Sequence, residues 1–230
     1  LERTVNVLHR QSGAEQTRLL PTLRMFKIGV KFDVGEGAGS ATAPQRTTEA
    51  PRFSDRERQQ AAGFVATETD KRMIRALQQD LPAERRPFDA WARQAGVDVD
   101  VLLATARSYE ARKAMRRFSA VLHHREAGFD ANAMGVWKVP PDRVEWFGRE
   151  AATFRAVSHC YQRPTYDDWP YNCFTMVHAT SAQQCDRVLK EISDATGIRD
   201  YGALYSTVEY KKVRVPYFTP EIEAWEREWG

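Results

Sequence analysis

The sequence is poor in cysteine, nearly balanced in charge and free of long apolar runs. Its three cysteines, Cys160, Cys173 and Cys185, have neither zinc-ligand spacing nor the pattern of a disulfide framework. We therefore expect a reducing, cytoplasmic setting. No apolar run is long enough to span a bilayer, and the start does not read as a signal peptide, so we expect no membrane contact. A net charge of +3 is too small to indicate nucleic acid by itself.

Chemistry-bearing residues are concentrated between residues 118 and 180. That stretch holds four of the five histidines, two of the three cysteines and three of the six tryptophans. Imidazole, guanidinium and phenol groups brought together suit an anionic ligand that must also receive a proton. The sequence therefore places the candidate site here.

The N-terminal residues 1–34 read as a helix, a stop at Ser12-Gly13 and a strand over 23–34. They match the end of the chain at one offset, since Lys27 and Lys211 lie 184 positions apart. The same offset relates three further pairs: Gly13 with Gly197, Leu20 with Leu204, and Phe26 with Tyr210. We interpret residues 1–34 as the C-terminal part of a first ferredoxin-like domain whose sheet another polypeptide completes.

Residues 35–63 are rich in Gly, Ala, Thr and Pro and predict an extended, flexible linker. A helix-turn-helix domain is expected over 64–124, with helices over 67–79, 87–95 and from Asp98 or Asp100, then a wing strand over 116–122. Residues 219–230 form a C-terminal tail, predicted to be a short helix on the surface or on a partner.

A second ferredoxin-like domain is expected over 125–218, in the order β-α-β-β-α-β. Its predicted elements are strands over 132–139, 156–163, 171–179 and 204–215, and helices over 142–154 and 181–196. The fold class is therefore α+β: a winged helix-turn-helix and a ferredoxin-like domain, preceded by the tail of a second ferredoxin-like copy.

Motifs within this order carry a family resemblance. The overall order is similar to the Lrp/AsnC transcription regulators. Four motifs resemble the sirohaem decarboxylases: Leu122-His123-His124-Arg125-Glu126-Ala127-Gly128-Phe129, Ala131-Asn132-Ala133-Met134, Val157-Ser158-His159-Cys160-Tyr161 and Trp169-Pro170-Tyr171-Asn172. Leu20-Pro21-Thr22 with Phe26-Lys27-Ile28-Gly29-Val30 resembles the end of the partner subunit of that enzyme.

The resemblance implies decarboxylation of sirohaem acetate side chains to methyl groups, giving 12,18-didecarboxysirohaem in haem d1 or alternative haem biosynthesis. It implies no cofactor beyond the iron-containing tetrapyrrole substrate. It also implies a second polypeptide or domain for the first half of the enzyme, in a heterodimer or higher oligomer.

The residues suit that chemistry. We assign carboxylate clamping to Arg125 and Arg163, since guanidinium binds carboxylate through two hydrogen bonds. Proton delivery is assigned to His124 or His159, with Tyr161 assisting. Further substrate-binding candidates are Tyr171, Asn172 and His178. No protein metal site is expected, although His124, His159 and His178 are each candidates for an axial ligand to the substrate iron.

Strand alternation predicts which of these residues share a face. In 156–163, one face carries Val157, His159, Tyr161 and Arg163, and the other carries Ser158, Cys160 and Gln162. In 171–179, His178 shares a face with Asn172, Phe174 and Met176, whereas Tyr171 shares one with Cys173 and Thr175. Sequence does not decide which of these two sets faces the site. Cys160 and Cys173 read as small buried residues.

Two other classes compete with the enzyme. A DNA-binding regulator of the Lrp/AsnC type is the first, but its third helix would open with Asp98-Val99-Asp100, and aspartates repel phosphate. We therefore expect that DNA is not a partner. The second is a non-catalytic haem-binding sensor, which turnover of sirohaem to carbon dioxide would exclude.

Overall fold

The computed structural model describes residues 2–29, 59, 62–115, 118, 131–208 and 213–229. The chain divides into two compact units. One contains residues 1–19, 56–118 and 211–230, and the other contains residues 20–55 and 119–210. The predicted linker lies almost wholly outside the described residues, as do most of the wing at 116–122 and both His124 and Arg125.

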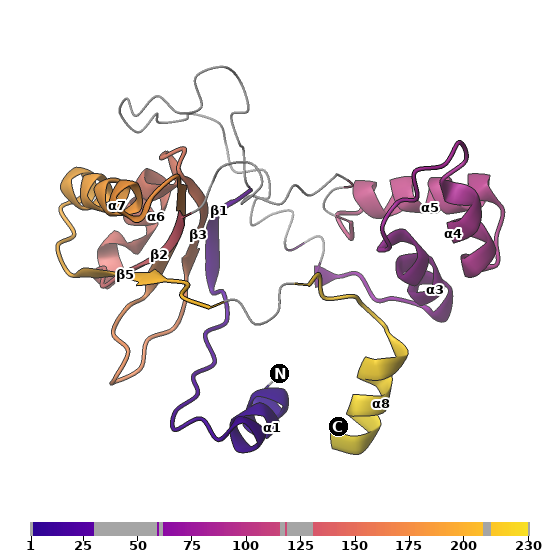
Figure 1. Cartoon of the computed structure of the whole chain (residues 1–230), viewed down its shortest axis with the longest axis horizontal. Coiled ribbons are helices and arrows are strands. Elements are labelled where there is room, and N and C mark those ends of the chain that lie inside the picture. Colours follow the sequence, from indigo (N-terminus) through magenta and orange to yellow (C-terminus); the bar gives the residue numbers. More distant parts are fainter. Residues whose placement is uncertain are drawn as a thin grey trace. The chain divides into compact units, whose positions relative to one another are not determined.

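The first unit holds the three expected helices of the helix-turn-helix, α3 (Glu68–Leu77), α4 (Phe88–Ala95) and α5 (Val99–Ala111) (Figure 1). Thr67 and Asp70 form a capping box at the start of α3, and Gly96 ends α4 in the left-handed conformation, with φ 71°. The three helices bury one cluster, made of Met73, Ala76, Trp91, Ala92, Ala95, Leu102 and Tyr109.

A polar contact ties α5 to the cap of α3. The Tyr109 hydroxyl donates to Asp70 Oδ1 at 2.6 Å. Hydrogen bonds from the Thr67 side chain, then from Tyr109, lower the pKa of Asp70 to about 2. Burial and the Asp70 carboxylate raise the pKa of Tyr109. The carboxylate therefore stabilises both the N-terminus of α3 and its packing on α5.

The C-terminal tail packs on α3 of the same unit. Its helix α8 (Pro220–Trp229) places Glu223 Oε1 2.5 Å from Arg75 Nη2. Ahead of α8, the Gln78 amide donates to the Tyr217 carbonyl at 3.0 Å and accepts from the Tyr217 amide at 2.7 Å. The predicted tail helix thus forms, and it is held by the helix-turn-helix domain.

The second unit is a five-stranded antiparallel sheet with helices on one face (Figure 1). Its strands are β1 (Arg24–Ile28), β2 (Ala131–Trp137), β3 (Val157–Gln162), β4 (Cys173–Ala179) and β5 (Tyr201–Tyr205). The order across the sheet is β1-β3-β4-β2-β5. The 3-10 turn η1 (Pro141–Arg143) leads into α6 (Val144–Ala152), and α7 (Ala182–Thr196) precedes β5. The α+β class with a ferredoxin-like β-α-β-β-α-β order is confirmed.

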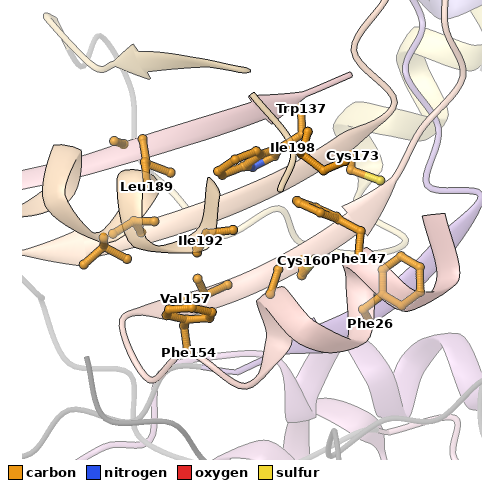
Figure 2. Packing of buried hydrophobic residues seen from close by; sticks show 14 of the residues in the cluster. Phe26, Trp137, Phe147, Phe154, Val157, Cys160, Cys173, Leu189, Ile192 and Ile198 are labelled. Carbon is orange, nitrogen blue, oxygen red and sulfur yellow. The ribbon is translucent and has the colours of Figure 1, made fainter. Parts of the chain in front are cut away.

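The core of this unit lies between the sheet and α6 and α7 (Figure 2). Trp137 Nε1 donates to Thr175 Oγ1 at 2.9 Å within it, and the Trp137 ring stacks on Tyr201 at 4.7 Å between centroids. That stacking fixes the start of β5. The last strand was predicted over 204–215 and instead runs from Tyr201 to Tyr205, whereas Val213 and Val215 are 64% and 78% exposed outside any strand.

The N-terminal segment departs from the predicted arrangement. Strand β1 pairs antiparallel with β3, so it forms the edge of the sheet made by residues 131–205. Phe26 enters that core and is 6% exposed, which anchors the strand (Figure 2). Helix α1 (Glu2–Ser12) belongs to the other unit. The described residues 2–29 are therefore divided between the two units of this chain.

The predicted repeat agrees with the structure at its helix. Helix α1 ends at Ser12 and α7 ends at Thr196, which are 184 positions apart. The residue after each is a left-handed glycine, Gly13 at φ 67° and Gly197 at φ 68°. The two segments thus share their helix end and its cap.

No helix in the described parts of the chain has the length and apolar character needed to cross a membrane.

Candidate functional site

The sheet has one face covered by α6 and α7 and one face that these helices do not cover, called here the open face. Cross-strand partners share a face, so the register assigns residues to it. His159 lies opposite Met176, and Tyr161 lies opposite Phe174. On the other side of β3, His159 faces Ile28 and Tyr161 faces Met25 of β1. Aromatic, thioether and imidazole groups from three strands therefore meet on the open face.

His159 and Tyr161 of β3 form a row on this face with Arg163, the second residue beyond Tyr161 and the first after the strand. The rings of His159 and Tyr161 are 5.8 Å apart between centroids. The Arg163 guanidinium lies 5.3 Å from the centroid of the Tyr161 ring and 5.5 Å from that of Phe174. Its Nη1 also donates to the carbonyl of Leu20. The predicted sharing of a face by these three residues is confirmed, and the arginine is held by two rings and a carbonyl.

The prediction for Val157 is wrong, because β3 carries a bulge. Val157 pairs with Val177, and His159 pairs with Met176. Two steps along β3 therefore match one step along β4, which leaves one extra residue on β3. Val157 consequently turns into the core with Cys160 (Figure 2). The extra residue is Ser158, which is 4% exposed. Its hydroxyl lies 2.8 Å from His159 Nδ1 and 3.3 Å from the Met176 carbonyl oxygen.

The structure shows which residues of β4 lie on the open face. Cys173, Val177 and Ala179 lie in the helix-covered core. Phe174, Met176 and His178 therefore point to the open face, as His159 does. His178 faces Asn132 of β2 across the strands. His159 and His178 are thus two imidazoles on one face, from neighbouring strands.

Asn172 is engaged by the backbone instead. Its Oδ1 accepts from the Val139 amide at 2.9 Å, and its Nδ2 donates to the Val139 carbonyl at 2.8 Å. Its own carbonyl accepts from the Arg163 amide at 2.9 Å. Asn172 precedes β4 and fastens the end of β2 to the end of β3, so the structure gives it a supporting role.

Tyr171 lies in the loop between β3 and β4, outside both strands. Its ring meets that of Trp169 edge to face, with centroids 5.3 Å apart. Trp169 and Tyr166 exchange two backbone hydrogen bonds, each 2.9 Å long. The Trp-Pro-Tyr-Asn motif therefore shapes this loop. The remaining site residues, His124 and Arg125, lie outside the described residues.

The cysteines are buried, as the sequence predicted for Cys160 and Cys173. Burial raises the pKa of Cys160, raises that of Cys173 to about 12 and raises that of Cys185 to about 11. Such thiols are not nucleophiles near neutral pH. Among the described residues, no group of three or more His, Cys, Asp or Glu side chains is arranged to hold a metal ion.

Sequence reasoning missed Ser158, Met25 and Ile28 as parts of this face. Strict alternation placed Ser158 on the opposite face, and a bulge leaves no signal in the residue pattern. The two β1 residues were assigned to a different sheet, and only the pairing of β1 with β3 brings them here.

Comparisons with known proteins agree with this architecture. Residues 70–116 match a family model described as "Siroheme decarboxylase NirDL-like HTH domain", and residues 126–211 match one described as "AsnC-like ligand binding domain". The chain is 41% identical over 147 residues to the siroheme decarboxylase beta subunit of Methanosarcina barkeri, covering 97% of that subunit. The chain belongs to the sirohaem decarboxylase family.

Longer members of the family match almost the whole chain. The siroheme decarboxylase of Hydrogenobacter thermophilus is 36% identical over 229 residues, 99% of this chain. This chain spans 64% of the length of that relative. A crystal structure of the siroheme decarboxylase NirDL superposes with a TM-score of 0.67 at 31% identity, covering all of this chain and 62% of NirDL. A second NirDL structure, at a TM-score of 0.66, is a complex with an iron-uroporphyrin III analogue.

The sirohaem decarboxylase fold is shared with transcription regulators. Escherichia coli AsnC superposes with a TM-score of 0.56 at 14% identity. The leucine response regulatory protein of Mycobacterium tuberculosis does so with a TM-score of 0.53 at 18% identity. These likenesses show the fold alone.

Proposed function

We propose that this chain is one half of a sirohaem decarboxylase, which converts acetate side chains of sirohaem to methyl groups. The carrying observation is the row of His159, Tyr161 and Arg163 on the open face, within a chain that is 41% identical to a decarboxylase subunit. The NirDL complex with an iron-uroporphyrin III analogue supports a flat, polycarboxylate ligand for this fold.

The chemistry needs a clamp and a proton. The bond between the side-chain carbon and the carboxylate breaks, carbon dioxide leaves, and its bonding pair remains on the carbon next to the macrocycle. The conjugated ring delocalises that charge until a proton bonds to the carbon, which gives a methyl group. No further cofactor is proposed, because the substrate is its own electron sink.

Arg163 suits the clamp. Its guanidinium is positioned by the Tyr161 and Phe174 rings, and the Leu20 carbonyl occupies one of its five N–H donors. Arginine binds a carboxylate through two parallel hydrogen bonds, which also orients it. His159 or Tyr161 would then supply the proton, and Arg125 and His124 are proposed to contribute from the segment between the two domains.

The site is proposed to be completed by a second polypeptide or domain in the cytoplasm. Relatives of this chain are named as subunits: a beta subunit in Methanosarcina barkeri, and NirH and NirL subunits in Stutzerimonas stutzeri. The open face would then be closed by the partner half, which would exclude water from the reacting acetate.

DNA binding is the weaker candidate. Helix α5 opens after Asp98 with Asp100 in its first turn, and Leu102 behind them is buried. The later basic residue Arg112 lies over the rings of Phe64 and Tyr109, at 5.1 and 5.4 Å. This helix end repels phosphate, so we expect no sequence-selective duplex binding at physiological salt.

The proposal is tested with paired arginine variants. Arg163→Ala should weaken binding of both sirohaem and iron-uroporphyrin III and lower turnover, because a clamp acts in ground and transition states. Arg143→Ala is the matched control, because Arg143, like Arg163, is held by a carbonyl and a ring: it donates to the Thr196 carbonyl at 2.7 Å and lies 4.8 Å from the Trp146 ring. Arg143 differs in its place, since it directly precedes α6, one of the two helices that cover the opposite face of the sheet. Equal effects of the two variants would contradict a substrate role for Arg163.

His159→Ala separates the remaining roles. Loss of a proton donor should lower carbon dioxide release by roughly 10²–10⁴-fold and leave porphyrin affinity nearly intact. Loss of an axial ligand should instead change the iron absorbance spectrum. Full activity of both His159→Ala and Arg163→Ala would place the chemistry on other residues.

A further inference from the structure

The bulge in β3 gives His159 a buried partner. Ser158 is 4% exposed, and its hydroxyl oxygen lies 2.8 Å from His159 Nδ1 and 3.3 Å from the Met176 carbonyl oxygen. A serine hydroxyl has one proton to donate and two lone pairs to accept. A carbonyl oxygen can only accept, so the two contacts constrain each other.

Only one proton arrangement makes both contacts hydrogen bonds. In it, Ser158 donates its proton to the Met176 carbonyl and accepts one from Nδ1–H of His159. In the opposite arrangement, Ser158 donates to a bare Nδ1 and faces the carbonyl with no proton between the oxygens. Buried polar groups are nearly always satisfied, which favours the first arrangement.

We propose that Ser158 is a positioning residue that holds His159 as the Nδ1–H form, so that Nε2 is the nitrogen that acts on the substrate. Only the part of this proposal that concerns the contact of Nε2 with the substrate rests on the proposed function. A neutral Nδ1–H imidazole has an Nε2 lone pair, which is suited to the substrate iron. An imidazolium that gives its Nε2 proton to the side-chain carbon becomes the same neutral form, which Ser158 stabilises.

The bulge explains why this pair forms. In a regular strand, Ser158 and His159 would point to opposite faces. The register shift between Val157 and His159 turns Ser158 out of alternation and brings its hydroxyl to the ring nitrogen. Bulges beside functional sites commonly redirect a side chain in this way.

The test begins with the full chain and no ligand. At about pH 8 an ordinary imidazole is neutral. We would record ¹⁵N spectra of histidine-labelled protein, assigning His159 among the five histidines by its loss in His159→Gln. We expect Nδ1 of His159 to be the protonated nitrogen, and expect Ser158→Ala to shift the proton towards Nε2.

Two variants keep this test specific. Ser158→Thr retains a hydroxyl and should restore the Nδ1–H form. Ser193→Ala is the matched control, because Ser193 is also buried, at 2% exposed, and its hydroxyl donates to the Ile198 carbonyl at 2.7 Å, but it lies in α7. Ser193→Ala should leave the His159 signals unchanged.

The second readout uses iron-uroporphyrin III binding and sirohaem turnover. Loss of the residue that orients a working histidine commonly costs 10–100-fold in metal affinity or activity. We expect a loss of this size in Ser158→Ala and recovery in Ser158→Thr.

The outcomes separate the two claims. An Nε2–H form in the unmodified protein, or one that does not respond to Ser158→Ala, overturns the positioning role whatever the activity. An Nδ1–H form that depends on Ser158, in a protein that neither binds the porphyrin nor releases carbon dioxide when it is assembled with its partner half, supports the proton arrangement and contradicts the proposed function.

Discussion

Gly148 in α6 tests whether the N-terminal strand truly belongs to this sheet. A Cβ added at Gly148 would lie 2.3 Å from Phe26 Cδ2 and 2.4 Å from Phe26 Cε2 and Cγ. Contacts under 3.0 Å require something to move. Because Cγ is among these atoms, a rotation of the ring does not relieve the overlap, and β1 itself must shift against α6.

The expected magnitude follows from two opposed effects. Replacing glycine by alanine inside a helix stabilises it by about 1 kcal/mol. Overpacking a core costs about 1–3 kcal/mol. We therefore expect Gly148→Ala to lower the free energy of unfolding of this unit by up to about 2 kcal/mol.

The sign should reverse when the ring is removed. Phe26→Ala alone should cost about 3–5 kcal/mol, as for other buried phenylalanines. In the Phe26→Ala background, the overlap is gone and Gly148→Ala should stabilise by about 1 kcal/mol. The coupling free energy between the two positions should then be about 1–3 kcal/mol, a size typical of residues in contact.

The cysteines supply an assay confined to this unit. Cys160, Cys173 and Cys185 are the three cysteines of the chain, and all are buried in the sheet unit. Pulsed thiol labelling at increasing urea concentrations therefore reports the unfolding of this unit and not of the helix-turn-helix. If Gly148→Ala stabilises the unit equally with and without Phe26, the ring does not lie over α6 and the placement of β1 is refuted.

Three further predictions concern other contacts. Asp70 has a folded-state pKa of about 2, below its ordinary 3.8, so the stability that its carboxylate contributes should be complete above about pH 5 and lost as pH falls towards 2. Asp70→Asn should lower the free energy of unfolding by about 1 kcal/mol near pH 7. Unfolding measured over a range of pH should show that the variant has lost this pH dependence. Asn172→Ala removes two hydrogen bonds to Val139 and should lower the free energy of unfolding, measured by thiol labelling, by about 1–3 kcal/mol. Unchanged affinity for iron-uroporphyrin III would confirm a supporting role for Asn172, and a selective loss of that affinity would refute it. Gln78→Ala removes both bonds to Tyr217 and should speed proteolytic cleavage ahead of α8; an unchanged cleavage rate would mean that these bonds do not hold the tail.

Local signals were sufficient for most of the elements. The Thr67 capping box, the glycines after α4 and α7 and the Ser181 cap are each encoded within a few neighbouring residues. Such signals act through short-range hydrogen bonds and backbone conformation, so a sequence shows them directly. The order helix-turn-helix then β-α-β-β-α-β followed from these boundaries, and with it the family.

The alternation of strands also placed the central row. His159, Tyr161 and Arg163 lie two residues apart, and a regular strand puts such residues on one face whatever surrounds it. Sequence therefore determined which groups lie side by side in this row: a guanidinium, a phenol and an imidazole.

Tertiary contacts decided what those residues touch. The bulge that turns Val157 inward and Ser158 towards His159 arises from pairing with β4, which no local pattern encodes. The pattern of β1 does not show which strand it pairs with, and only the tertiary structure places it beside β3, with the Phe26 ring against Gly148. The last strand likewise begins at Tyr201, earlier than predicted, where the Tyr201 ring stacks on Trp137. Sequence determined which groups are present, because side-chain chemistry is local, and the tertiary structure decided their partners, because contacts distant along the chain depend on how the layers pack.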